Sequence, residues 1–201
     1  MSEEYEVILA TDPRNRELGD AGYELVAESW GARLRLSEPP DLDLTVAHEA
    51  VRRAELAGLT VRELDESLAP ALHALEEANR ADYPDTPATP PRLLNEDDTR
   101  RLWSKGCRIF GALDNGVLVG ATVIKEGDDR AETAFTSVLA TYRRRGIGTA
   151  VKAASIIALA SQGVRLFGTG GATVNAASLR ANEALGYVVE ERWLSYRKPS
   201  N

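Results

Sequence analysis

The chain has 201 residues, of which 43% are hydrophobic and 27% charged, and its net charge is −7. This composition is typical of a globular protein with one full domain and an additional segment. The acidic balance argues against a nucleic-acid partner, which requires a broad basic face. The single cysteine, Cys107, excludes an internal disulfide, and no residue pattern indicates a metal site. Because the sequence lacks a signal peptide pattern and a bilayer-length apolar stretch, we expect a cytoplasmic protein that binds no membrane.

The first 58 residues predict short strands and one helix. Residues 5–10 form a strand-like run that leads into a turn, and residues 23–36 indicate two strands with a kink near Gly31. Apolar residues at helical spacing then predict a helix over 45–56, which ends at Gly58.

From residue 59 onward the pattern is that of a mixed α/β domain. A strand at 59–64 precedes a helix over 65–81, where Pro70 falls in the tolerant first turn, and the proline-rich residues 82–92 predict a loop. The remaining predicted elements are a helix at 96–103 capped by Asn95, a hairpin of 108–113 and 117–124, a strand at 132–139, a helix from Thr149 to about Ser161, a strand at 164–167, a helix at 175–185, and strands at 187–191 and 193–197.

Residues 136–150 carry the strongest functional signal. A strand-like run ends in three consecutive arginines, Arg143 to Arg145, and a helix follows two glycines. Cations at a helix N-terminus oppose the macrodipole, so three of them indicate an anionic ligand at this turn. The glycines allow backbone amides to approach that ligand closely. A solvated basic turn is the alternative interpretation.

The motif Arg143-x-x-Gly146-x-Gly148 resembles the coenzyme A pyrophosphate loop of the GNAT acetyltransferases, and residues 175–187 resemble a second GNAT signature. The resemblance extends over residues 59–198. It implies the GNAT fold, in which a mixed, mostly antiparallel sheet is flanked by helices, with acetyl-CoA as cosubstrate and no metal. The coenzyme-binding residues that it implies are Thr136, Ser137, Val138, Arg143, Arg144, Arg145, Gly146, Ile147, Gly148, Thr149, Asn175 and Ser178.

The same resemblance implies candidate catalytic groups. Glu132 lies eleven residues before Arg143, where the histone-acetylating branch of the family carries its base, and Glu126 is the second choice. A solvated strand-end glutamate is the alternative for Glu132. An oxyanion donor is expected among the backbone amides of residues 136–138. Asn182 occupies a position that often holds a tyrosine acid, and an amide cannot act as an acid at neutral pH, which leaves a water molecule as the candidate.

Two asparagines therefore carry predicted roles with simple alternatives. Asn175 is expected to contact the pantetheine arm and Asn182 to lie in the catalytic region, whereas a helix cap and a surface amide are the structural alternatives. A weaker motif, Gly168-x-Gly170-Gly171, hints at a dinucleotide-binding unit. That minor alternative lacks the third glycine and leaves the arginine loop unexplained.

The resemblance implies an N-acetyltransferase that acts on a primary amine of a small molecule or peptide by direct transfer in a ternary complex. The alternative is a non-catalytic acyl-CoA-binding or protein-interaction module. His48 and His73 lack suitably spaced partners and are expected to have packing roles. The implied acceptor-lining residues, which suit a cationic amine, are His73, Asn79, Asp82, Tyr83 and Asp85.

An internal similarity links residues 18–30 with residues 182–193, since each has a helix end, Gly-Tyr, acidic strand positions and a tryptophan. We interpret residues 1–45 as a truncated GNAT-like repeat that adds strands to a sheet, 46–58 as a linker helix and 59–198 as the acetyltransferase domain. Chance similarity is the alternative. Terminal strands such as 193–197 can pair with another subunit, so a homodimer is also a hypothesis.

Overall fold

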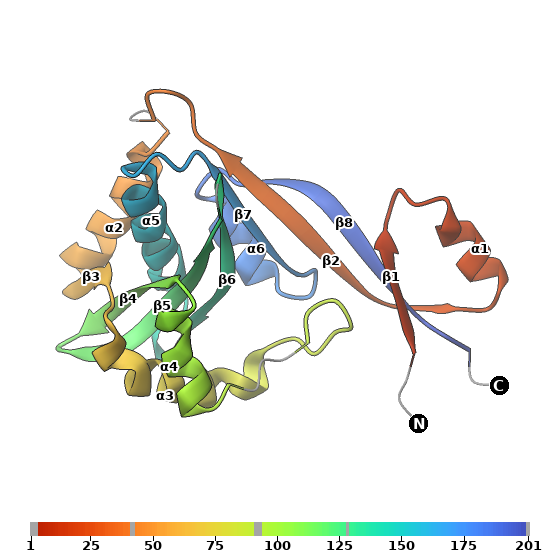
Figure 1. Ribbon diagram of the computed structural model, residues 1–201, viewed down its shortest axis with the longest axis horizontal. Helices are drawn as coiled ribbons and strands as arrows, with labels where there is room; N and C mark the ends of the chain where they lie inside the picture. Colours follow the sequence, from red (N-terminus) through yellow and green to blue (C-terminus); the bar gives the residue numbers. More distant parts are fainter. Residues whose placement is uncertain (1–3, 41–42, 91–93, 128, 200–201) are drawn as a thin grey trace.

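A computed structural model describes residues 4–40, 43–90, 94–127 and 129–199. Within these residues eight strands form one sheet of order β1-β8-β2-β7-β6-β5-β4-β3, in which only β6 and β7 are parallel (Figure 1). The strands are β1 (Tyr5–Leu9), β2 (Glu24–Arg35), β3 (Leu59–Glu63), β4 (Cys107–Asp114), β5 (Val117–Glu126), β6 (Arg130–Val138), β7 (Leu166–Ala172) and β8 (Val188–Arg197). The predicted mixed α/β class, with a mostly antiparallel sheet, is confirmed.

The described part of the chain contains six α-helices. They are α1 (Arg14–Asp20), α2 (Thr45–Leu56), α3 (Ala69–Asn79), α4 (Glu96–Ser104), α5 (Ile147–Ala160) and α6 (Ala176–Glu183). The predicted cap of α4 is confirmed, since Asn95 Oδ1 accepts a hydrogen bond from the Asp98 amide at 2.8 Å. Residues 91–92 of the predicted loop, and residues 1–3 and 41–42 of the predicted N-terminal repeat, lie outside the described residues.

Four predicted segments differ from the structure. The strand predicted at 164–167 is β7, which covers 166–172 and includes the glycine-rich residues 168–171. Residues 24–35 form the single strand β2, because register shifts near Leu25 and Gly31 bend the strand without ending it. Residues 188–197 likewise form one strand, β8, where two were predicted. The predicted helix over 65–81 is divided into α3 and two short 3-10 turns, Glu66–Leu68 and Arg80–Asp82.

Helices cover both faces of the sheet. Helices α2 and α5 pack on one face around Trp30, Ile156 and Phe167, and α3 and α4 pack on the other around Leu72 and Ile109 (Figure 1). Burying each of these large side chains contributes about 1.5–3 kcal/mol. The sheet therefore separates two cores and can carry different groups on its two faces. Cys107 is buried in the second core, as expected of a structural thiol, and burial raises its pKa.

The N-terminal segment is part of the main sheet. Strand β2 lies between β7 and β8, and β1 pairs with the outer side of β8. The order β1-β8-β2-β7 is unchanged when the unit β1-α1-β2 is exchanged with β7-α6-β8. The two units also end their helices in the same way, because the Tyr23 amide donates to Leu18 and the Tyr187 amide to Asn182. The internal similarity of the sequence is thus matched in local structure, while the division into 1–45, 46–58 and 59–198 stays a prediction.

The last strand does not offer the pairing edge that the sequence suggested. Residues 193–197 of β8 pair with β1 on one side and with β2 on the other. In the described sheet the outer strands are instead β1 and β3. Residues 193–197 therefore offer no free edge for pairing with a second subunit, and the homodimer itself stays a prediction.

Candidate active site

A gap opens between the parallel strands β6 and β7. Their pairing is limited to residues 130–132 and 166–168. Beyond Glu132, β6 continues to Val138 in register with β5 only, and β7 continues to Ala172 in register with β2. A bulge at residue 134 of β6 interrupts its register with β5 and increases the local twist. The two strands consequently diverge over 133–138 and 169–172.

Backbone amides of β6 point into this gap. The Leu139 amide donates to the Val119 carbonyl at 3.0 Å, which fixes the alternation of hydrogen bonds along β6. This alternation directs the amide of Ser137 toward β5 and the amides of Thr136 and Val138 toward the gap. Of the three predicted oxyanion donors, Thr136 and Val138 are therefore the two with suitable geometry.

Arg143 anchors the arginine loop to the end of α3. Its Nε donates to the Val138 carbonyl at 3.1 Å, and its Nη2 donates to Asn79 Oδ1 at 2.7 Å and Asp82 Oδ2 at 2.6 Å. The buried Asn79 also donates to Ser137 Oγ at 2.8 Å. Asn79 and Asp82, which were expected to line the acceptor site, thus position the loop.

The rest of the loop is also held in a defined shape. Arg144 and Gly146 have φ values of 63° and 76°, and a left-handed backbone favours glycine at the second of these positions. Tyr142 donates to Asp114 Oδ2 at 2.7 Å, and the Arg145 guanidinium lies 5.0 Å from the Tyr142 ring centroid. The loop therefore presents Arg144 and Arg145 at the surface beside the start of α5.

The N-terminus of α5 has the features of an anion site. Its N-cap is Gly146, which supplies no side-chain hydrogen bond, whereas Asn175 caps α6 with its side chain. The first-turn amides of Ile147, Gly148 and Thr149 thus lack a side-chain partner in the described structure, and the helix dipole favours an anion there. These residues fit the diphosphate of a coenzyme.

We predict that Gly148→Ala weakens acetyl-CoA binding about tenfold while the fold is retained. A Cβ at this position meets only Val138 and Thr136 methyl groups at 3.7 and 3.8 Å, which is ordinary contact. The substitution should stabilise the helix by about 0.5–1 kcal/mol, because alanine is the better helix former. Calorimetric titration with acetyl-CoA, together with denaturant unfolding, measures both effects.

Gly19→Ala is the matched control for this variant. Gly19 also lies in a helix, and a Cβ there meets nothing within 4 Å. Figure 1 shows α1 beside β1, at the other end of the molecule from α5. It should give the same gain in stability without any change in coenzyme affinity. Unchanged affinity in Gly148→Ala would show that no ligand approaches this backbone closely.

The second motif has one expected and one unexpected arrangement. Asn175 caps α6, with its Oδ1 accepting from the Ser178 amide at 3.1 Å, as the structural alternative held. Asn182 is not a surface amide, because it is fully buried. Its Oδ1 accepts from Lys152 Nζ at 2.7 Å and its Nδ2 donates to the Ser178 carbonyl at 2.8 Å. Coenzyme contacts of Asn175 and Ser178 stay predictions.

Lys152 is a functional candidate that the sequence analysis missed. It is the one charged residue of α5, and its Nζ also donates to Thr133 Oγ1 and Thr169 Oγ1 at 3.3 Å. Burial lowers the pKa of Lys152 to about 7 from an ordinary value of 10.5. The folded state therefore binds fewer protons than the unfolded chain between these values. Protonated Lys152 destabilises the fold below pH 7, and this penalty declines as the pH rises toward 10.5.

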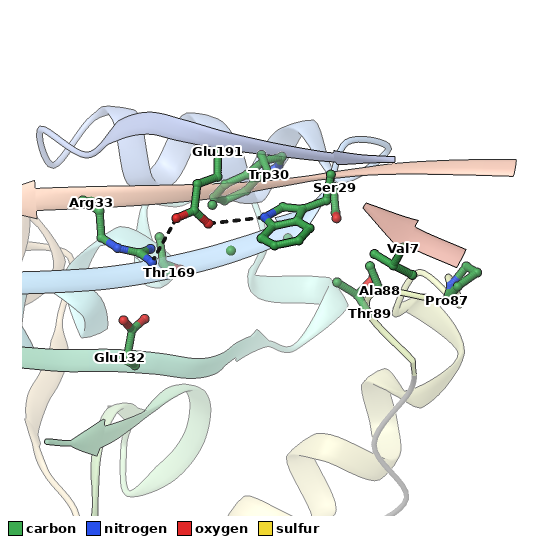
Figure 2. A pocket seen from close by; sticks show the side chains of 14 residues that line it. Val7, Ser29, Trp30, Arg33, Pro87, Ala88, Thr89, Glu132, Thr169 and Glu191 are labelled. Carbon is green, nitrogen blue, oxygen red and sulfur yellow. Dashed lines mark hydrogen bonds and ion pairs between the residues drawn. The ribbon is translucent and has the colours of Figure 1, made fainter. Parts of the chain in front are cut away.

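A pocket of about 520 Å³ lies on the face of the sheet opposite α5, over strands β2, β7 and β8 (Figure 2). Gly31, Gly170 and Gly171 contribute to its lining from β2 and β7, and the loop residues 87–89 lie across from them. These glycines make room for neighbouring groups of the protein, since a Cβ at Gly31 would meet the Glu191 carboxylate at 2.9 Å and one at Gly171 would meet the Trp30 ring at 3.0 Å.

Glu132 faces this pocket from β6, across from Arg33 and Glu191 (Figure 2). Its carboxylate lies directly over Gly168, where a Cβ would be 2.1 Å from Oε2. The Glu132 side chain is 36% exposed, with Arg130 Nε 3.8 Å from Oε1. The predicted base is thus accessible from the pocket, at the point where β6 and β7 begin to separate.

The opposite wall of the pocket combines charge with an aromatic surface. Arg33 Nη2 lies 3.8 Å from Glu191 Oε1, and Trp193 Nε1 donates to Glu191 Oε2 at 3.3 Å. These residues had no role in the sequence analysis, although Trp193 was part of the internal similarity. Their strands come together only through the insertion of β2 between β7 and β8.

The remaining residues expected at the acceptor site lie elsewhere. Tyr83 donates to Glu76 at 3.1 Å, and neither Tyr83 nor Asp85 lines the pocket. His73 Nδ1 is buried and has no hydrogen-bond partner among the described residues. His48 lines a different pocket, between α2 and α5. The acceptor-lining role expected for His73, Tyr83 and Asp85 has no support in this geometry.

The dinucleotide alternative is not supported. Gly168, Gly170 and Gly171 lie inside strand β7 and not in a turn between a strand and a helix. Such glycines cannot form the phosphate-binding turn that this motif requires.

The described residues show neither a metal site nor a membrane-spanning helix. No group of three or more histidine, cysteine, aspartate or glutamate side chains there is arranged to hold a metal ion. None of the helices in the described ranges is long and apolar enough to cross a membrane.

A comparison with protein-family models identifies the family to which a chain with this loop and gap belongs. Residues 72–187 match the model of the acetyltransferase (GNAT) family. The chain belongs to this family. The match includes β6, the arginine loop, α5 and both strands of the gap, so the GNAT fold accounts for the site described above. A search of curated proteins finds no match to the chain.

Solved GNAT structures share the fold at low sequence identity. A GCN5-related N-acetyltransferase from Sphaerobacter thermophilus has a TM-score of 0.68 and 17% identity over 100% of this chain and 62% of its own. A tandem GNAT protein from the clavulanic acid biosynthesis pathway has a TM-score of 0.62 and 20% identity over 98% of this chain and 65% of its own. The ribosomal-protein-S18-alanine N-acetyltransferase of Escherichia coli has a TM-score of 0.54 and 19% identity over 71% of this chain and 96% of its own. The chain therefore spans less than two thirds of the first two proteins.

Proposed function

We propose that this GNAT protein transfers the acetyl group of acetyl-CoA to a primary amine of a small molecule or peptide, directly in a ternary complex. Family membership supports acyl transfer in general. The observation that carries the finer proposal is the arrangement of the gap between β6 and β7. An uncapped helix N-terminus follows the open end of β6, and a pocket with the carboxylate of Glu132 adjoins the closed end.

The diphosphate of acetyl-CoA would be held at the start of α5. The amides of Ile147, Gly148 and Thr149 are suited to bind its oxygens, and the exposed side chains of Arg144 and Arg145 add positive charge beside them. The extended pantetheine arm would then lie in the gap and bring the thioester to β6.

Transfer to the amine needs a base and an oxyanion donor. Glu132 would accept the proton of the incoming amine, directly or through one water molecule. The amide of Thr136 or Val138 would donate to the oxygen of the tetrahedral intermediate, since both amides point into the gap. The chain would then supply positioning, a proton acceptor and oxyanion stabilisation.

The chemistry of the pocket favours a cationic acceptor. Glu132 and Glu191 place two carboxylates in its lining against one guanidinium, that of Arg33, while Arg130, which lies 3.8 Å from Glu132, is outside the lining. The indole of Trp193 adds an aromatic surface on which an ammonium group or an apolar chain can pack. Cytoplasmic location and a homodimer remain part of the proposal.

Two measurements on the full chain test the proposed function. Calorimetric titration with acetyl-CoA should detect binding, and a coenzyme-release assay against a panel of primary amines should detect turnover with at least one cationic amine. Absence of any binding heat with acetyl-CoA and with free coenzyme A would refute the proposal. Tight binding without turnover on any amine would instead identify a non-catalytic acyl-CoA-binding module.

A further inference from the structure

Lys152 reaches the point where β6 and β7 separate. Pairing between the strands ends at Glu132 and Gly168, and Thr133 and Thr169 are the next residues along each strand. The Nζ of Lys152 donates to the hydroxyl oxygens of both threonines at 3.3 Å. A single side chain from α5 therefore bridges the two strands at the narrow end of the gap.

An ammonium group is an unfavourable choice for a purely structural bridge. Lys152 is only 4% exposed, and its third hydrogen bond, of 2.7 Å, goes to the neutral Asn182. None of the carboxylates in the described ranges forms an ion pair with it. A buried charge without a counterion destabilises the fold, and an apolar side chain of similar length would fill the same space. The charge is thus better explained by an anion that forms in the gap.

We propose that Lys152 donates a proton to the sulfur of coenzyme A when the thiolate departs. This inference rests on the proposed acetyl transfer, which generates two anions in the gap. The amides of Thr136 and Val138 can donate hydrogen bonds to the oxyanion. Asn182 cannot protonate the sulfur, because an amide is not an acid at neutral pH. Lys152, whose Nζ donates to Asn182 Oδ1 at 2.7 Å, supplies the missing acid.

The proton balance of this step is complete. The amine nitrogen forms its bond to the acyl carbon and loses a proton to Glu132, and the carbon–sulfur bond breaks with its electron pair on sulfur. Lys152 transfers one Nζ proton to that sulfur and becomes a neutral amine. After the products leave, Glu132 releases its proton to solvent and Lys152 regains one, so that both groups return to their starting states. The two 3.3 Å bonds to threonine hydroxyls are long, so one of them is readily exchanged for a bond to sulfur.

The titratable groups around Nζ favour this direction of transfer. The pKa of Lys152, lowered by burial to about 7, lies below the value of about 8.5 for an ordinary thiol. The ring centroid of Tyr187 is 5.5 Å from Nζ, but burial raises the pKa of that phenol and makes it a poor donor. Glu132 faces the pocket on the other side of β6 and acts as the acceptor of the amine proton.

The test uses Lys152→Met and Lys152→Arg in the full chain with acetyl-CoA and an amine that the wild type acetylates. Methionine keeps the length without a proton, and arginine keeps the charge but does not release its proton. We expect kcat to fall about 10²-fold or more in both variants, with KM for acetyl-CoA changed less than about threefold. In the wild type, kcat should also decline as the pH rises through the pKa of Lys152.

A second readout is independent of turnover. The ultraviolet absorbance of the thiolate gives the pKa of bound coenzyme A, which should be about one unit lower in the wild type than in Lys152→Met. Lys105→Met removes an exposed lysine and should change neither quantity. Should the methionine variant not fold, Thr169→Val removes one acceptor of Nζ and should shift the decline of kcat to lower pH.

The outcomes separate this inference from the proposed function. Full turnover in Lys152→Met, or full activity restored by arginine, would overturn proton donation while leaving acetyl transfer intact. An unchanged pKa of bound coenzyme A in Lys152→Met would overturn it as well. Failure of the wild type to bind acetyl-CoA would remove both proposals together.

Discussion

Glu132→Gln is expected to lower kcat by about 10²- to 10⁴-fold without weakening acetyl-CoA binding. Glutamine has the size of glutamate but accepts no proton from an incoming ammonium group. Its side chain would still lie over Gly168 at the edge of the pocket, so the fold and the coenzyme site stay intact. Steady-state kinetics over a range of pH, with calorimetric titration of acetyl-CoA, measure both effects.

Two companion variants sharpen this prediction. Gly168→Ala introduces a methyl group about where the Glu132 carboxylate lies, so the carboxylate must move and kcat should fall although Glu132 is present. Glu126→Gln changes the exposed second candidate at the end of β5 and should leave kcat unchanged. If Glu132→Gln keeps the turnover and pH profile of the wild type, Glu132 is not the base.

Trp30→Ala is expected to destabilise the whole protein by about 3–5 kcal/mol. Trp30 is 2% exposed, belongs to the core between the sheet and α5, and its ring packs over Gly171. Its indole Nε1 has no hydrogen-bond partner in the described structure, so the loss is one of apolar contacts. Because β2 pairs on both sides, the cavity would lie in this core over an interior strand, away from the edges of the sheet. Denaturant unfolding followed by circular dichroism gives the free energy of unfolding.

Leu56→Ala is the control for this stability measurement. Leu56 ends α2 with 76% of its surface exposed, and its truncation should change the free energy of unfolding by less than about 0.5 kcal/mol. A loss below about 1 kcal/mol in Trp30→Ala would mean that the N-terminal segment is loosely attached. The expected large loss would instead make residues 24–35 a required part of the acetyltransferase fold.

Local patterns predicted most elements because their physical causes are local. Helix α2 follows from apolar spacing and ends before Gly58, whose φ is 87°. Asn115 and Gly116 both have positive φ and close the predicted hairpin between β4 and β5. The long strands were less predictable, since β2 and β8 continue through bulges that look like chain breaks in sequence.

In the candidate site, too, the parts formed by consecutive residues were predictable and the parts assembled from distant segments were not. The loop from Arg143 to Gly148 was recognisable because its function depends on consecutive residues at one helix start. The role of Arg143 as an anchor was not, since its partners Asn79 and Asp82 lie more than sixty residues away in the chain. The pocket opposite α5 was missed for the same reason, because Arg33 belongs to a strand that is distant in sequence from β7 and β8.

The sequence by itself determined the family, the order of most elements and the turn that suits a diphosphate, since each depends on spacing within a short segment. Only the tertiary structure decided that β2 enters the sheet beside the site, which amides face the gap, and that Lys152 is buried beneath it. The spacing of Lys152 in α5 does not reveal its partners. Its hydrogen bonds and its lowered pKa arise when two strands and two helices enclose one ammonium group.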